Sequence, residues 1–120
     1  MKIIPDALNN LTKSRFRSSF KLDRKDLDHL SRTGIKTIES HARDFMLKRL
    51  ASRKPENDGR QTPFKGHPVF KAQHATATCC SNCLKKWYNI PKNKSLDTDE
   101  IDFIVKLVMA WIKKWQIPKK

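Results

Sequence analysis

The sequence contains no long hydrophobic run. No stretch of about 18 apolar residues occurs in its 120 residues, so it predicts no membrane-spanning helix. The opening segment, MKIIPDALNNLTK, is too short and too interrupted in its apolar part for a secretory signal peptide. We therefore expect a cytoplasmic protein in a reducing compartment, where clustered cysteines more often bind metal or react than form disulfides.

Several catalytic motifs are also missing. The sequence has no H-E-x-x-H motif, no Walker loop and no G-x-G-x-x-G fingerprint. No glutamate occurs between residues 57 and 99, so the H-x-E and P-C-x-x-C pattern of zinc deaminases does not fit. Leu84 follows the C-x-x-C pair where a c-type haem site needs histidine. No βαβ pattern supports a thioredoxin-like redox pair.

Acidic residues are scarce relative to basic ones. The chain has 26 Lys and Arg against 12 Asp and Glu, a formal net charge of +14 and a pI near 10.1. Such an excess favours polyanionic partners, so nucleic acid is the first candidate and an anionic membrane surface or acidic protein the second. The alternative is a solvated surface. The residues expected to contact phosphates are Arg15, Arg17, Lys21, Lys65, Lys71, Lys85 and Lys86.

The sequence contains a series of helix signals, and no segment has the pattern of a convincing strand. We therefore expect a mostly α, small single-domain helical fold. Asp23 can cap a helix that Gly34 ends, and a second helix should run over about residues 35–52. Residues 53–66 are expected to form a long ordered loop. Residues 1–21 are expected to be a basic N-terminal arm, either solvated or in contact with phosphates.

Three further helix signals lie in the second half of the chain. Pro68 suits the first position of a short helix, and Thr78 can cap a helix over residues 79–88. Asp97 and Glu100 form an acidic capping box for the last helix, which carries one apolar face. The expected domain therefore spans residues 22–117.

All three cysteines and two of the four histidines lie within residues 66–88. Cys80 and Cys83 form a C-x-x-C pair in the first turn of an expected helix, where the helix dipole favours the thiolate that binds zinc. Tetrahedral zinc takes nitrogen and sulfur ligands, so we predict a zinc site here, against the alternative of buried, reduced cysteines. Which four residues bind the metal stays open. The candidate ligands are His67, His74, Cys79, Cys80 and Cys83.

His41 lies beside the apolar stripe of the helix expected over residues 35–52. It is either a core histidine with one hydrogen bond or a residue that reaches the cysteine cluster and binds the metal.

The stretch TPFKGHPVFKAQHATATCCSNCLKKW, with NDGRQ before it and MAWIKKW after it, resembles a bacterial and phage family. That family is classified as a domain of unknown function, number 4186, and the resemblance covers nearly the whole chain from about Phe16. It implies no established activity. In the family a histidine commonly follows the Lys-Trp pair, whereas Tyr88 stands there in this chain. A tyrosine is a poor zinc ligand, so we expect this position to pack or to support ligands.

The same motif is rich in hydroxyl, amide and imidazole groups, more than a structural zinc knuckle needs. These groups could line a pocket, hydrogen-bond metal ligands or cap short helices. They are Asn57, Asp58, Gln61, Thr62, His67, Gln73, His74, Thr76 and Thr78.

Four functions are consistent with these features, and a zinc-stabilised nucleic-acid-binding module is our leading interpretation. The second is a metal-dependent hydrolase or nuclease, with His67, His74 and one cysteine on the zinc and Asp58 or His41 as the base. The third is a cysteine nucleophile, Cys79 or Cys80, beside His74, which Asp58 or Asn82 would orient. The fourth is a phage or mobile-element protein that binds a host protein.

Overall fold

The C-terminal helix α7 (Thr98–Lys113) is the helix around which the others pack. It contacts α1 (Ile4–Thr12), α4 (Ile35–Phe45) and α5 (Pro68–Ala75) in this computed structural model. The structure describes residues 3–51, 61–64, 66–92 and 94–115. The remaining elements in those residues are α2 (Arg15–Ser18), α3 (Arg24–Thr33), the π-helical turn η1 (Met46–Leu50) and α6 (Ser81–Tyr88).

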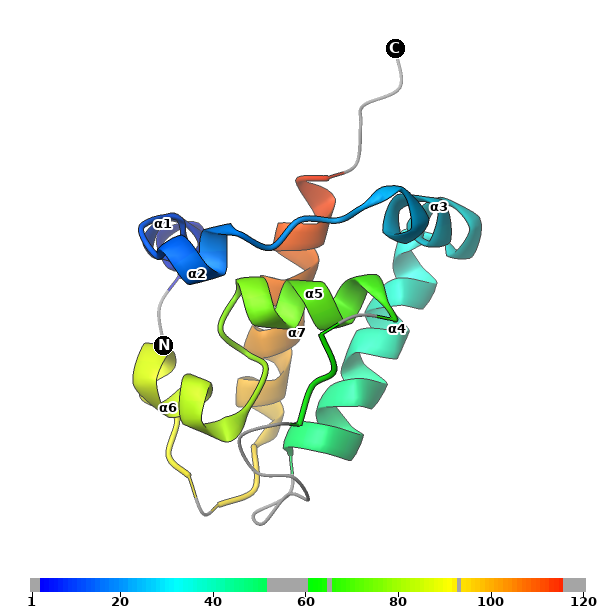
Figure 1. Cartoon of the computed structure of the whole chain (residues 1–120). Coiled ribbons are helices and arrows are strands. Elements are labelled where there is room, and N and C mark those ends of the chain that lie inside the picture. The colour runs from blue at the N-terminus through cyan, green and yellow to red at the C-terminus, as the bar shows by residue number, and fades with distance from the viewer. Residues whose placement is uncertain (1–2, 52–60, 65, 93, 116–120) are drawn as a thin grey trace.

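Figure 1 shows α5 lying across α7, with α1 and α2 on one side and α3 and α4 on the other. The buried side chains form one hydrophobic core, to which α7 contributes the largest share, including Ile104, Leu107 and Val108. No strand occurs among the described residues, which confirms the expected mostly α fold. In those residues no helix is both long and apolar enough to cross a bilayer.

Side-chain caps define the best predicted helices. Asp23 accepts a hydrogen bond from the backbone N–H of Asp26, and the Asp26 carboxylate accepts one from the N–H of Asp23. Asp97 and Glu100 form the same reciprocal box at the start of α7. Each box satisfies two backbone donors that a helix N-terminus otherwise leaves unpaired, so both helices begin where the sequence indicates.

The helix predicted over residues 35–52 is present, but its last turn changes type. Gly34 ends α3 and precedes α4 with a φ of 88°, a left-handed value that glycine adopts without strain. The helix then widens into η1, where the N–H of Ala51 donates to the carbonyl of Met46 at 2.9 Å. The predicted loop that follows falls mostly on residues 52–60 and 65, which lie outside the described residues.

The N-terminal segment differs from the basic arm that we expected over residues 1–21. Residues 4–18 form α1 and α2, and α1 buries Ala7, Leu8 and Leu11 in the same core as α7. The physical reason is the apolar spacing of Leu8 and Leu11 with Ile4, which places all three on one helical face. The packing of this stripe on α7, rather than the basic residues that follow it, determines the structure of the segment.

Replacing Leu11 by alanine tests whether α1 belongs to the core. Leu11 is 4% exposed, so Leu11→Ala should lower the free energy of unfolding by about 2–5 kcal/mol. Leu47 is 52% exposed, and Leu47→Ala is the matched control, with an expected change below about 0.5 kcal/mol. Urea unfolding measures both. Equal midpoints for the two variants would contradict the placement of α1.

Candidate metal centre

A tight turn between α5 and α6 brings the three cysteines together. Ala77 has a φ of 60°, which reverses the chain after α5, and the N–H of Thr78 donates to the Gln73 carbonyl at 2.8 Å. The Thr76 hydroxyl donates to the Ala72 carbonyl at 2.7 Å, and the hydroxyls of Thr76 and Thr78 lie 3.0 Å apart. The hydroxyl groups of the motif therefore hold the turn in place.

The helix that follows begins two residues later than we predicted. Thr78 does not cap it; Cys80 does, because its sulfur accepts a hydrogen bond from the backbone N–H of Cys83 at 3.4 Å. The Thr62 hydroxyl donates to the Cys79 carbonyl at 2.7 Å and fixes the residue before the cap. Cys79 and Cys80 thus precede α6, and Cys83 lies in its first turn.

The sulfur atoms form a compact triangle. The Sγ atom of Cys83 lies 3.6 Å from that of Cys79 and 3.3 Å from that of Cys80, and all three lie within 4.8 Å of one another. Zn–S bonds of about 2.3 Å in a tetrahedron place two sulfurs about 3.8 Å apart. The triangle therefore has the size that a bound metal ion requires, and Cys79, Cys80 and Cys83 could hold one.

Arg17 of α2 contacts this triangle from the N-terminal part of the chain. One guanidinium nitrogen donates to the Cys83 sulfur at 3.0 Å, and the other lies 3.5 Å from the Cys79 sulfur and donates to the His74 carbonyl at 2.7 Å. The side chain is buried, with 8% exposure. A buried cation needs a negative partner, so this contact is consistent with at least one thiolate in the triangle.

The electrostatics within the triangle favour one thiolate. Hydrogen bonds from the thiols of Cys79 and Cys80, together with the Arg17 guanidinium, lower the pKa of Cys83 to about 2. The hydrogen bonds with Cys80 and Cys83 and burial raise the pKa of Cys79. Without metal the negative charge therefore resides on Cys83, and a thiophilic cation would displace the protons of the other two thiols.

His74, a candidate ligand, lies close to the triangle but is not part of it. Its ring stacks against Phe64 at 4.2 Å and Phe20 at 5.4 Å between centroids. Its Nε2 lies 3.2 Å from the Thr62 carbonyl and 3.1 Å from the Pro63 carbonyl, so Nε2 carries the proton that they accept. Burial lowers the pKa of His74, and the neutral ring orders the loop over the cysteine turn.

His67, the other candidate histidine, belongs to a separate histidine cluster. Its Nδ1 accepts a hydrogen bond from the N–H of Val69 at 3.0 Å and thereby caps α5. Its Nε2 lies 3.1 Å from Nδ1 of His41, and its ring meets that of His29 at 4.7 Å between centroids. His41 therefore contacts His67 in this structure rather than the sulfur triangle.

Most of the basic residues that we predicted to contact phosphates are exposed, and one forms ion pairs within the protein. Arg15, Lys21, Lys85 and Lys86 are exposed. Lys71 instead pairs with Asp26 at 2.5 Å and with Asp23 at 3.2 Å, joining α5 to α3. The predicted residues that lie outside the described part of the chain are Asp58 and Lys65.

Two other residues of the motif make local contacts. The Asn82 side chain accepts a hydrogen bond from Lys92. The Tyr88 hydroxyl donates to the Thr76 carbonyl, so Tyr88 packs beneath the cysteine turn as a supporting residue.

Arg17 and His29 are the residues whose roles the sequence reasoning missed. We assigned Arg17 to phosphate contacts, because nothing in its local sequence distinguishes it from Arg15. Its contact with Cys83 joins residues 66 positions apart, which only the tertiary packing of α2 on α5 establishes. His29 lies in the helix that Asp23 caps, and nothing in the sequence pattern indicates that its ring contacts His67.

Removing the charge of Arg17 should destabilise the protein. Arg17→Met keeps most of the side-chain stem but leaves the Cys83 thiolate unpaired, so we expect a loss of about 3 kcal/mol in the free energy of unfolding. Arg15→Met, on the same helix but exposed, is the matched control and should change stability by less than about 0.5 kcal/mol. Urea unfolding without added metal compares them, and similar losses in both variants would contradict the role of Arg17.

The histidine cluster should make stability depend on pH. Burial and the neighbouring His29 and His41 lower the pKa of His67 to about 4, below its ordinary value of 6.5. Between pH 4 and pH 6.5 the unfolded chain therefore binds more protons than the folded protein does. The contribution of His67 to the free energy of unfolding is complete above pH 6.5 and falls as the pH decreases toward 4. The loss should reach at most about 3 kcal/mol.

His67→Asn is the diagnostic variant for this pH dependence, because asparagine also caps a helix but does not titrate. Denaturant unfolding between pH 4 and 7 should show a shallower stability loss in His67→Asn than in the wild type. Parallel pH profiles would contradict a buried, neutral His67.

The comparisons with known proteins agree with the resemblance in the sequence. No solved structure matches the chain. The family model described as "Domain of unknown function (DUF4186)" matches residues 5–113, a stretch that includes α1 from its second residue on and every cysteine and histidine discussed above. That match covers most of the chain and confirms the resemblance. The chain therefore belongs to the DUF4186 family.

Proposed function

We propose that Cys79, Cys80 and Cys83 bind a zinc ion and that this zinc centre holds together a basic surface for nucleic acid. The observation that carries the proposal is the Arg17 contact with the sulfur triangle. Three thiolates and one Zn²⁺ have one net negative charge, and the single positive charge of Arg17 balances it in a buried place. A soft, sulfur-only donor set favours zinc over the oxygen-seeking metals.

The position of the centre in the fold supports a structural role for the zinc. Cys83 belongs to α6, Cys79 follows α5, and Arg17 belongs to α2. A metal at the triangle would stabilise the turn between α5 and α6 directly and would strengthen the attachment of α2 through Arg17. Metal-binding free energy would then contribute to folding, as it does in small zinc domains.

The exposed cations favour phosphate binding on the same side of the molecule. Lys85 and Lys86 are exposed on α6, and Arg15 and Lys21 are exposed on and just after α2. Figure 1 has α2 and α6 on the same side, and the Arg17 contact with Cys83 links them. The whole chain has a formal net charge of +14. This surface would therefore attract nucleic acid through its phosphates, with little sequence specificity.

A metal-dependent hydrolase is the second candidate, and the number of cysteines favours it. Three protein ligands leave a fourth position for water, as catalytic zinc sites do. The zinc would then lower the pKa of that water, while Arg17 would stabilise the thiolate ligands. The two candidates differ in whether the zinc is needed for the fold.

Metal analysis tests the zinc centre and separates the candidates. Untagged wild-type protein should contain about one zinc per chain, and Cys83→Ala should contain almost none. Asn82→Ala, next to Cys83 on α6, is the matched control and should keep its zinc. Because Cys83→Ala also removes the partner of Arg17, the melting temperature is compared in the wild type before and after a chelator removes the zinc, and a lower value without zinc supports a structural zinc. Zinc loss without a change in melting temperature supports the hydrolase, and metal-free wild-type protein contradicts both.

Binding of duplex DNA at several salt concentrations tests the basic surface. If Lys85 and Lys86 each meet a phosphate, the double variant Lys85→Ala, Lys86→Ala should reduce the slope of log K against log salt by about 2. Lys36→Ala with Lys48→Ala removes the same charge from exposed positions on α4 and η1 and is the control. Equal slopes in the two double variants would contradict a surface on α6.

A further inference from the structure

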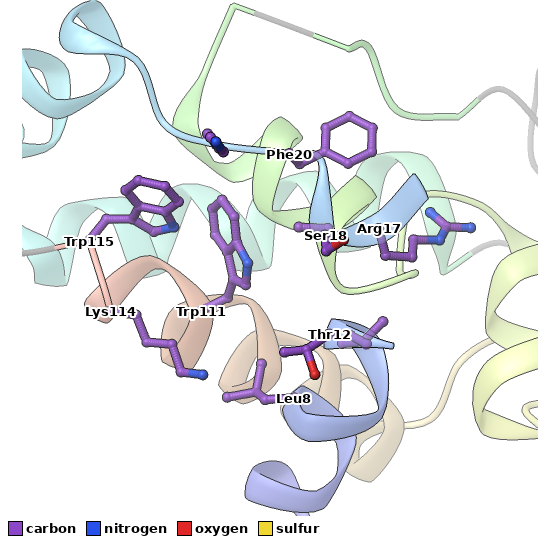
Figure 2. Close-up of a pocket in the computed structure, with 11 residues that line it drawn as sticks. Leu8, Thr12, Arg17, Ser18, Phe20, Trp111, Lys114 and Trp115 are labelled. Atoms are coloured by element: carbon purple, nitrogen blue, oxygen red, sulfur yellow. The ribbon is translucent and has the colours of Figure 1, made fainter. Parts of the chain in front are cut away.

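A second site lies where α1, α2 and the end of α7 meet. The cavity there has a volume of about 350 Å³, and Figure 2 shows the side chains around it. Leu8 and Thr12 come from α1, Ser18 and Phe20 from α2 and the residues after it, and Trp111 from the last turns of α7. The size lies at the lower end of the range for small-molecule pockets.

Aromatic rings form much of the wall. The indoles of Trp111 and Trp115 lie 5.6 Å apart between centroids and at 51° to each other, so neither ring covers the whole face of the other. Both side chains are half-buried, and Figure 2 shows them side by side next to the cavity. Leu8, Leu11 and Ala75 add apolar side chains to the lining. A flat, apolar-faced ligand is the shape that such walls fit.

The charges around the cavity are all positive. Lys21 and Lys114 are exposed residues of its lining, Arg17 is the third cation, and no acidic residue lines it within the part of the chain that the structure describes. Figure 2 shows Arg17 pointing away from the two tryptophans, in keeping with its contacts to the cysteine sulfurs. Lys21 and Lys114 are therefore the cations available to a ligand. Aromatic walls with cationic residues are typical of sites that stack a base and meet a phosphate.

We propose that this pocket binds one nucleobase together with its phosphate. The base stacks on Trp115, which lies outside the core that Trp111 packs against, and the phosphate lies near Lys21 and Lys114. Bases in a duplex are paired and stacked on both faces, so the occupant is an unpaired base of single-stranded nucleic acid or a free nucleotide. The inference deepens the proposed nucleic-acid binding, because it rests on that function and adds a preference for single strands.

The pocket also shares an element with the metal centre. Arg17 contacts the sulfur triangle, while Ser18, Phe20 and Lys21 just after it line the cavity. The anchoring of Arg17 therefore positions one wall of the base pocket, and the same short segment serves both sites.

Trp115→Ala is the test variant, because Trp115 lies beyond the end of α7 and its loss spares the core. Affinities are measured at one salt concentration for a labelled single-stranded oligonucleotide and for the corresponding duplex. Stacking of one base predicts that Trp115→Ala binds the single strand about ten-fold more weakly, with duplex affinity unchanged. Trp115→Phe should recover most of the loss. Leu47→Ala, which removes an exposed apolar side chain outside the pocket, should bind like the wild type.

The outcomes separate the pocket from the basic surface. If wild type and Trp115→Ala bind the single strand equally, the pocket is overturned while the phosphate-binding surface stands. If the wild type binds neither oligonucleotide, the proposed nucleic-acid function is overturned, and adenosine monophosphate then decides the pocket. Quenching of tryptophan fluorescence by this nucleotide in the wild type but not in Trp115→Ala supports a site for free nucleotides. No quenching in either protein overturns the pocket as well.

Discussion

A buried guanidinium that contacts two cysteine sulfurs connects the two halves of this protein. Arg17 lies on a helix of only four residues, which has little stability of its own. Its contacts with Cys83, Cys79 and the His74 carbonyl hold that helix against the turn between α5 and α6. Because the guanidinium is buried, it requires a negative charge close by, and a thiolate among the sulfurs supplies it. A buried thiolate in turn requires the positive charge of the guanidinium. The candidate metal centre, the attachment of α2 and one wall of the aromatic pocket all involve this interaction.

The thiols and the histidines occupy different places in the fold, and this separation changes the chemistry that the sequence suggested. A mixed Cys/His site would have placed His67 or His74 beside the sulfurs. Instead the His74 ring stacks against Phe64 and Phe20, and His67 caps α5 and contacts His41. Among the described residues the donors at the triangle are therefore three sulfurs, which could hold a thiophilic metal, and a buried positive charge lies beside them.

Local signals predicted much of the helical fold, whereas long-range contacts determine the site. Capping boxes at Asp23 and Asp97, the left-handed Gly34 and Pro68 at a helix start are all encoded within a few residues, and each is present. The proximity of the three cysteines also followed from their spacing. The Arg17 contact did not, because it joins residues more than 60 positions apart through the packing of α2 on α5. The N-terminal helix α1 was predictable from its apolar stripe, but the basic residues after it suggested an arm.

X-ray absorption at the zinc edge of the zinc-loaded protein tests the central claim most directly, because it counts the atoms bound to the metal. The account predicts three sulfur ligands at about 2.3 Å and one lighter atom at the fourth position. A spectrum dominated by nitrogen and oxygen ligands, or one with fewer than three sulfurs, would contradict a centre formed by Cys79, Cys80 and Cys83.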